Sequence, residues 1–229
     1  MPGIKVIIPA YNEAESIGKV IGSIPSIVDE IIVVNNKSTD KTLENAQAAG
    51  ATVLTENRPG YGFACLKGME YIVQKNDPPG IIVFLDGDFS DYPEDLPKIV
   101  APIISGEADF VVGARVKALR EKGSMTPQQI FGNRLATFLR KLIFASRFTD
   151  LGPFRAIRYE TLQSLNMSDK TYGWTVEMQL KVLKQKIAYA EVPVRYRKRI
   201  GVSKVSGTLK GTVLAGYKII GWIIKYSFK

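Results

Sequence analysis

The chain has 229 residues, enough for one α/β domain with a substantial core, and its formal net charge is +9. With no histidine and a single cysteine, Cys65, the sequence excludes an internal disulfide, thiolate and imidazole zinc sites, and histidine-activated nucleophiles. The positive excess lies at the C-terminal end, because residues 184–229 hold eleven Lys and Arg against one acid, Glu191. This asymmetry favours an anionic partner for that end: membrane lipid, a phosphate-bearing acceptor or nucleic acid.

Short runs rich in β-branched residues predict strands at residues 4–9, 31–34, 51–54, 81–85 and 109–114. Apolar residues at helical spacing follow each of the first three runs. Strands that are nearly continuous in apolar residues and alternate with helices predict a mostly parallel sheet covered on both faces. The sequence shows neither a signal peptide nor a charge-free stretch of about 18 residues, so we expect a cytoplasmic protein without a membrane-spanning helix.

The turn after the first predicted strand reads Pro9-Ala10-Tyr11-Asn12-Glu13. It has neither the glycine-rich dinucleotide fingerprint nor a Walker lysine, so the dehydrogenase and P-loop NTPase interpretations lose most of their support. A ring, an amide and a carboxylate at a strand end can instead stack a base and accept hydrogen bonds from ribose hydroxyls. The alternative is that the polar pair only caps the next helix.

The fourth predicted strand runs directly into Asp86-Gly87-Asp88, and further carboxylates follow from Asp91 onward. Carboxylates this close repel one another unless a cation lies between them, and oxygen ligands of this kind suit Mg²⁺ or Mn²⁺. Open α/β sheets bind ligands at the carboxyl ends of their strands, so Asp86 and Asp88 are the candidate metal ligands. The alternative is an acidic loop in which Asp91 caps the following helix.

Seven segments resemble, in order and at about the same spacing, the inverting family 2 glycosyltransferases with the GT-A fold. The segments are VIIPAYNEAESI, IIVVNNKSTDKT, NRPGYGFACLKGM, FLDGDFSDYPEDL, VVGARV, DLGPFRAIR and RYRKRIGVSKVSG. The polyprenyl-phosphate (dolichol-phosphate) mannosyl- and glucosyltransferase branch is the most similar. The resemblance covers residues 4 to about 207, so we expect a Rossmann-like GT-A catalytic domain over residues 1–207 and a C-terminal amphipathic helix over residues 208–229.

The resemblance implies that the protein is a metal-dependent enzyme that moves a hexose from a UDP- or GDP-hexose to polyprenyl phosphate. It also assigns roles to particular residues. Asp86 and Asp88 would hold Mg²⁺ or Mn²⁺ against the donor diphosphate, because a cation stabilises the charge that develops on the leaving group. The remaining assignments place Pro9, Tyr11, Glu13 and Asn35 around the nucleoside and Arg115, Arg134, Arg199, Ser203 and Lys204 around the phosphates. Of these, Asp88 and the three arginines are the candidate catalytic residues.

Three departures from the family pattern leave the substrates open. Asn35 replaces a usual aspartate and Lys37 a common glycine, which leaves the base preference undecided, and Pro153 replaces a glycine in DLGPFR. One alternative is a soluble sugar or hydroxyl acceptor with Asp91 or Glu177 as its base, although Glu177 is better explained as a structural or acceptor-orienting residue. Another is a nucleotide-sugar-binding protein without turnover, recruited to membranes.

The C-terminal segment, residues 209–228, is apolar apart from Lys210, Lys218 and Lys225. On a helix these lysines fall within an arc of about 80°, which is typical of an anchor lying in a membrane interface. The alternative is a terminal helix docked on the catalytic domain or on a twin subunit, so a homo-oligomer is left open. Nucleic acid is not an expected partner, because the aromatic residues sit among aliphatic ones.

Overall fold

The computed structural model describes residues 2–202 and 209–227, with the backbone alone for residues 209–215, 219 and 227. Within this part of the chain seven strands form one sheet in the order β3-β2-β1-β4-β6-β5-β7. Their bounds are β1 (Ile4–Ala10), β2 (Glu30–Asn35), β3 (Thr52–Thr55), β4 (Ile81–Phe84), β5 (Phe110–Ala114), β6 (Arg155–Arg158) and β7 (Tyr189–Pro193). Strand β6 runs antiparallel to β4 and β5, and the other neighbouring pairs are parallel.

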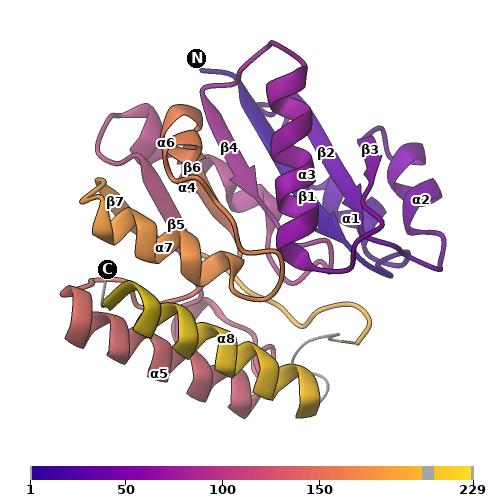
Figure 1. Cartoon of the computed structure of the whole chain (residues 1–229). Helices are drawn as coiled ribbons and strands as arrows, with labels where there is room; N and C mark the ends of the chain where they lie inside the picture. The colour runs from indigo at the N-terminus through magenta and orange to yellow at the C-terminus, as the bar shows by residue number, and fades with distance from the viewer. Residues whose placement is uncertain (1, 203–208, 228–229) are drawn as a thin grey trace.

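Helices cover both faces of the sheet (Figure 1). One face packs against α1 (Ile17–Gly22), α2 (Thr42–Ala48) and α4 (Leu96–Ile104). The other packs against α3 (Tyr61–Gln74), α6 (Tyr159–Ser164) and α7 (Trp174–Lys184). Two short 3₁₀ turns, η1 (Pro93–Asp95) and η2 (Lys117–Leu119), precede α4 and follow β5. The predicted sheet with helices on both faces is therefore confirmed.

A further layer lies outside α7. It consists of α5 (Pro127–Phe144) and α8 (Leu209–Ser227), which run side by side (Figure 1). Trp222 and Ile223 of α8 are buried with Ala136 of α5 and Val176 and Leu180 of α7. One side of the C-terminal helix thus docks on the rest of the chain, and its membrane contact and the domain division at residue 207 remain predictions.

The buried strand residues alternate between the two faces because successive side chains on a strand point in opposite directions. Ile8 and Val83 face α1 and α4, whereas Ile7 and Phe84 face α3 and α7.

Among the described residues, no helix combines the length and the apolar character needed to cross a bilayer.

Candidate functional site

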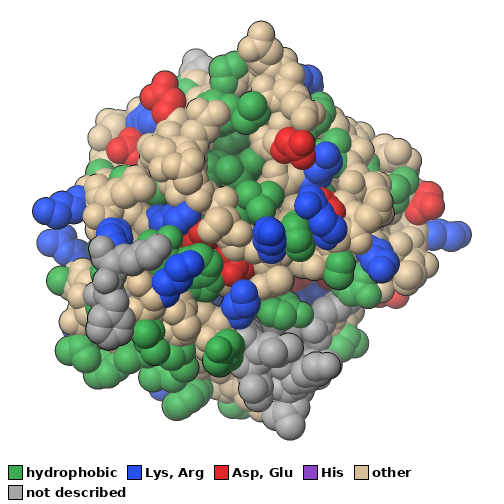
Figure 2. Space-filling model, in the orientation of Figure 1, with side chains coloured by type: hydrophobic (Ala, Val, Ile, Leu, Met, Phe, Trp, Pro, Cys, Tyr) green, Lys and Arg blue, Asp and Glu red, His purple; other side chains and the backbone are tan. Residues whose placement is uncertain are grey.

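A cavity of about 660 Å³ opens where β1, β2 and β4 end. Its wall is formed by the turns after these three strands, the start of α3, Thr171 and Tyr172 from a distant loop, and Arg199. Figure 2 shows acidic side chains near the centre of this face, with Lys and Arg side chains around them. The site therefore lies at the carboxyl edge of the parallel strands, where open α/β sheets bind ligands.

The turn after β1 is held in place by the turn after β2. The backbone N–H of Asn12 donates to Ser38 Oγ at 3.0 Å, and that of Glu13 donates to Thr42 Oγ1 at 2.8 Å. Pro9, Tyr11 and Glu13 all line the cavity, as the placement of the nucleoside there requires. Tyr11 is 44% exposed, so its side chain is accessible to a planar base.

Two adjacent asparagines, the last residue of β2 and the residue after it, have different positions. Asn35 is buried and does not line the cavity, and its Oδ1 accepts from the backbone N–H of Ser38 at 3.2 Å. Asn36 lines the cavity and fixes the loop before α3, because its Nδ2 donates to the carbonyl of Arg58 at 2.7 Å and its Oδ1 accepts from Gly60 N–H at 2.8 Å. A nucleoside contact for Asn35 remains a prediction, and Asn36 is the neighbour that the sequence interpretation missed.

Lys37, which also lines the cavity, occupies a position that favours glycine. Its φ of 63° lies in the left-handed region, where a side chain is strained. The replacement of a common glycine is therefore tolerated here at a backbone cost, and it adds a cation to the cavity wall.

Asp86 and Asp88 follow β4 and both line the cavity. Asp86 accepts from Tyr61 Oη at 3.1 Å, and burial together with the negative charge of Asp88 raises the pKa of Asp86 to about 7. Asp88 Oδ1 accepts from the backbone N–H and the hydroxyl of Ser90, at 2.9 and 2.6 Å. Ser90 therefore fixes the rotamer of Asp88, and Oδ2 of Asp88 is left for partners other than Ser90.

Arg199 connects the acidic pair to the turn after β1. Its guanidinium contacts Asp88 Oδ2 at 3.1 Å and Glu13 Oε1 at 2.8 Å. The segment that carries Arg199 lies along the loop after β4, because Arg197 N–H donates to the Ser90 carbonyl at 2.9 Å and Ile200 N–H to the Asp88 carbonyl at 3.0 Å. Arg199 is thus the predicted phosphate ligand that the structure brings to the acidic pair.

The other predicted phosphate ligands do not line the cavity or lie outside the described residues. Arg115 is engaged by Asp150, whose carboxylate accepts from its Nε at 2.8 Å and from its NH2 group at 2.6 Å. Arg134 lies on the exposed side of α5 and does not line the cavity. Ser203 and Lys204 are the two that lie outside the described residues. The roles of these four residues in phosphate binding remain predictions.

Asp91 is a buried acid whose negative charge the nearby Arg115 offsets only in part. It is 2% exposed, and neither of its carboxylate oxygens has a hydrogen-bond partner among the described residues. Burial, and then the charges of Asp86 and Asp88, raise its pKa well above the usual range. It does not cap a helix, so the capping alternative is wrong for this residue.

The loop that contributes Thr171 and Tyr172 was not predicted from the sequence. Asp169 organises it by accepting from the backbone N–H groups of Thr171 and Gly173, at 2.7 and 3.0 Å. Glu177, at 0% exposure, holds the loop's start by accepting from Ser168 and Asp169 N–H. Glu177 therefore has a structural role, one of the two roles expected from the sequence. No local motif marks the loop, because the loop reaches the cavity only in the folded chain.

The acidic pair fits a hard divalent cation. Among the described residues no cluster of three Asp, Glu, His or Cys side chains could enclose a metal ion. Mg²⁺ and Mn²⁺ are commonly held by one or two carboxylates together with water and substrate phosphates. A cation at Asp86 and Asp88 would relieve the repulsion that raises the pKa of Asp86.

Solved structures share the fold of this chain. Glucosyl-3-phosphoglycerate synthase from Mycobacterium tuberculosis, solved with Mn²⁺, UDP and phosphoglyceric acid, superposes with a TM-score of 0.80 at 24% identity. The match covers 99% of this chain and 78% of that one. The GT-A fold expected from the sequence is thereby confirmed.

Curated relatives match over almost the whole chain. An uncharacterized glycosyltransferase of Mycobacterium tuberculosis is 34% identical, over 93% of this chain and 94% of the relative. The dolichyl-phosphate hexose transferase of Haloferax volcanii is 31% identical over 92% and 90%, and the undecaprenyl-phosphate mannosyltransferase of Micrococcus luteus is 26% identical over 91% and 89%. The model of the family "Glycosyl transferase family 2" matches residues 5–165. The chain therefore belongs to glycosyl transferase family 2 and is a glycosyltransferase.

Proposed function

We propose that this glycosyltransferase moves a hexose from a nucleoside diphosphate sugar to polyprenyl phosphate and depends on Mg²⁺ or Mn²⁺. The observation that carries the proposal is the meeting of Asp86, Asp88 and Arg199 at one wall of the cavity, with Tyr11 and Glu13 at another. Two relatives whose names include dolichyl-phosphate and undecaprenyl-phosphate, at 31% and 26% identity, support the acceptor class.

The donor would lie with its nucleoside against Tyr11, Pro9 and Glu13 and its diphosphate at the acidic pair. A bound divalent cation supplies Lewis-acid stabilisation of the charge that develops on the departing nucleoside diphosphate. Arg199 would meet the same phosphates, because a guanidinium fork matches phosphate oxygens. Its Nε is buried and has no hydrogen-bond partner among the described residues, so a donor remains for a ligand oxygen.

The acceptor chemistry agrees with the composition of the chain. A phosphate monoester is already an anion, so transfer to it needs positioning and charge compensation more than a base. The chain has no histidine, and Glu177 is committed to the 168–169 backbone. Arg115 and Arg134, with Ser203 and Lys204, are the residues we assign to the phosphates on this side.

The donor site is tested by calorimetric titration of the protein with UDP and with GDP, each with and without Mn²⁺. We expect metal-dependent binding of one nucleotide, and Asp88→Asn should lower its affinity at least about tenfold, since it removes one charged metal ligand. Asp77→Asn, at an acid with a 77% exposed side chain, is the matched control and should bind as the wild type does. Binding without any transfer would support a nucleotide-sugar-binding protein, and no binding would contradict the donor site.

A soluble hydroxyl acceptor that bears a phosphate is the second candidate, because a structural neighbour was solved with phosphoglyceric acid. Transfer from the nucleotide sugar that binds is therefore measured with a short-chain polyprenyl phosphate and with 3-phosphoglycerate, in parallel and in detergent. We expect the polyprenyl phosphate to accept the hexose. Transfer to the soluble acid alone would leave the donor site intact and overturn the lipid acceptor.

A further inference from the structure

Helix α5 exposes a continuous apolar stripe. Phe131, Leu135, Phe138 and Leu142 are 69%, 36%, 62% and 73% exposed. At about 100° per residue these four side chains fall within an arc of about 60°. The opposite side of the helix is buried through Ala136 and Arg140, so α5 has a partner on one side only in the described structure. Soluble proteins rarely leave such a stripe uncovered, and it indicates an interaction surface.

The ends of α5 are defined by its own sequence. Thr126 and Gln129 form a capping box, in which Thr126 Oγ1 accepts from Gln129 N–H at 3.2 Å and Gln129 Oε1 accepts from Thr126 N–H at 2.8 Å. Pro127 occupies the first turn, and Ala145 ends the helix in a left-handed conformation. The stripe therefore belongs to a formed helix, which keeps its four apolar side chains on one side.

Helix α8 extends the surface beside α5. Tyr217, Ile220 and Ile224 are 76%, 38% and 49% exposed, whereas Trp222 and Ile223 pack toward α5 and α7. Figure 1 shows the two helices side by side, and Figure 2 shows hydrophobic side chains gathered at the edge of the molecule where α5 lies. The exposed apolar residues of both helices therefore belong to one outer layer.

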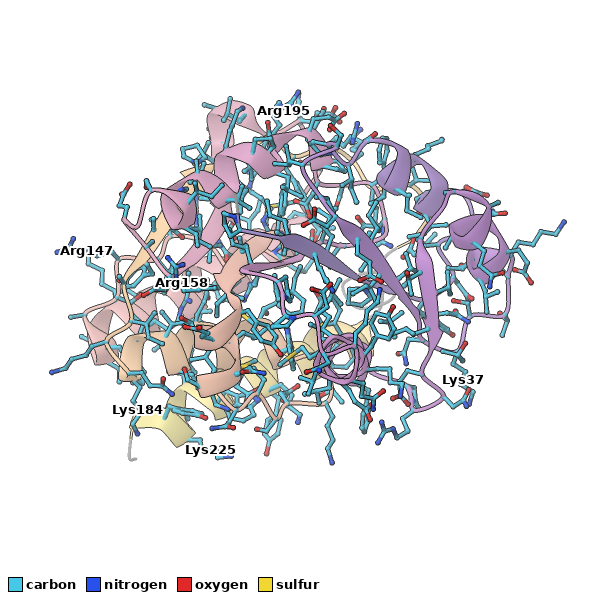
Figure 3. The ribbon with its side chains drawn as sticks, turned by 90° about the horizontal axis from the view of Figure 1, so that it is seen from above. Lys37, Arg147, Arg158, Lys184, Arg195 and Lys225 are labelled. Carbon is cyan, nitrogen blue, oxygen red and sulfur yellow. The ribbon has the colours of Figure 1, made fainter. Side chains whose placement is uncertain are left out.

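The charged residues on α5 and α8 have a single sign, and one of them, Lys218, contacts Asp169 of the loop before α7 at 3.6 Å. Residues 122–149 and 209–227 contain Lys and Arg but no Asp or Glu. On α5, Arg134 and Lys141 are both exposed and lie about 60° to 80° to one side of Phe131. Arg147, Lys184 and Lys225, near the C-terminal ends of α5, α7 and α8, project outward (Figure 3). An apolar stripe beside basic side chains is typical of helices that lie in a membrane interface.

We infer that α5 and the exposed side of α8 form a docking surface for an anionic lipid bilayer. The apolar stripe enters the boundary between headgroups and acyl chains, and the basic side chains meet the lipid phosphates. A second copy of the chain fits less well, because two such faces would bring Arg134 and Lys141 of each copy together with no acid from α5 or α8 to pair with them. Docking on a bilayer would bring the cavity to a lipid acceptor, and this consequence rests on the proposed function.

The experiment is co-sedimentation of the full chain with vesicles of phosphatidylcholine alone and of equal parts phosphatidylcholine and phosphatidylglycerol. We expect binding to the anionic vesicles that weakens as salt is added. The double variant Phe138→Ser/Leu142→Ser should lose at least about tenfold in vesicle affinity, since burial of each large apolar side chain contributes about that factor. The matched control, Val73→Ser/Ile104→Ser, removes side chains that are 56% and 45% exposed on other helices and should bind as the wild type does.

Two further measurements distinguish a lipid-docking surface from a subunit interface and from loss of the donor site. Light scattering after gel filtration reports the oligomeric state: a dimer that the double variant dissociates, with no vesicle binding by the wild type, would assign the stripe to a second copy and overturn the inference. Calorimetry with UDP or GDP and Mn²⁺ reports the donor site and the fold. Vesicle binding without nucleotide binding would refute the proposed function alone, and nucleotide binding without vesicle binding would refute the surface alone.

Discussion

Among single residues, Asp91 should make the stability of the protein depend on pH. Its raised pKa means that the folded protein keeps a proton that the unfolded chain releases near pH 4. The free energy of unfolding therefore falls as pH rises from about 4 toward the folded pKa. Asp91→Asn cannot titrate, so in EDTA the variant should gain on the wild type by more than about 1 kcal/mol between pH 4 and pH 8. Urea unfolding at both values measures this, and parallel pH profiles would contradict it.

Individual site residues were predictable where a motif fixes them. Asp86 and Asp88 follow a buried strand, so the sequence alone predicts that they lie at the edge of the sheet. In the structure both line the cavity. Asn35 and Asn36 are adjacent amides, and a shift of one residue decides which of them faces the cavity. The sequence cannot resolve that shift, because the wall depends on the bonds of Asn36 to a loop more than twenty residues away.

Among the elements, the start of α3 is fitted to the loop at residues 168–171. Gly62 N–H donates to the Thr171 carbonyl at 3.3 Å, and a Cβ on Gly62 would overlap the backbone carbonyl of Asp169. Gly62→Ala should therefore cost about 1–3 kcal/mol of stability and weaken nucleotide binding, since both segments line the cavity. Gly18→Ala is the control: no atom lies within 4 Å of its added methyl, and the change should stabilise α1 by about 0.5–1 kcal/mol.

Thermal unfolding and calorimetric titration of both glycine variants test this fit. Equal stability and equal nucleotide affinity in the two variants would contradict it.

The strands and helices of the first half were predictable from the period of their apolar residues and from β-branching, and each predicted strand is confirmed. The antiparallel placement of β6 between β4 and β5 was not, because pairing direction depends on a chain reversal that local propensity does not encode.

Across the whole molecule, the C-terminal helix contacts a loop of the cavity wall through the carboxylate of Asp169. Trp222 Nε1 donates to Asp169 Oδ2 at 2.6 Å, and Asp169 Oδ1 holds the backbone of the loop that contributes Thr171 and Tyr172 to the cavity wall. The sequence showed the apolar tail but could not show this contact, since its partners lie more than fifty residues apart. The apolar face that docks α8 and the loop that shapes the site are thus joined at a buried carboxylate.

Trp222→Phe keeps most of the ring packing and removes the donor, so it separates this bond from the burial of α8. The variant leaves Lys218 Nζ, at 3.6 Å, as the remaining described partner of Asp169 Oδ2. The loss of a hydrogen bond to a buried carboxylate costs about 1–3 kcal/mol, so we expect the loop to lose order and the affinity for the donor nucleotide to fall several-fold. Tyr217→Phe, on the same helix at a residue 76% exposed, should leave that affinity unchanged. Calorimetry gives the affinities, and hydrogen exchange at residues 168–173 gives the loop order. Unaltered exchange together with unaltered nucleotide affinity in Trp222→Phe would mean that α8 only covers α7 and takes no part in shaping the cavity.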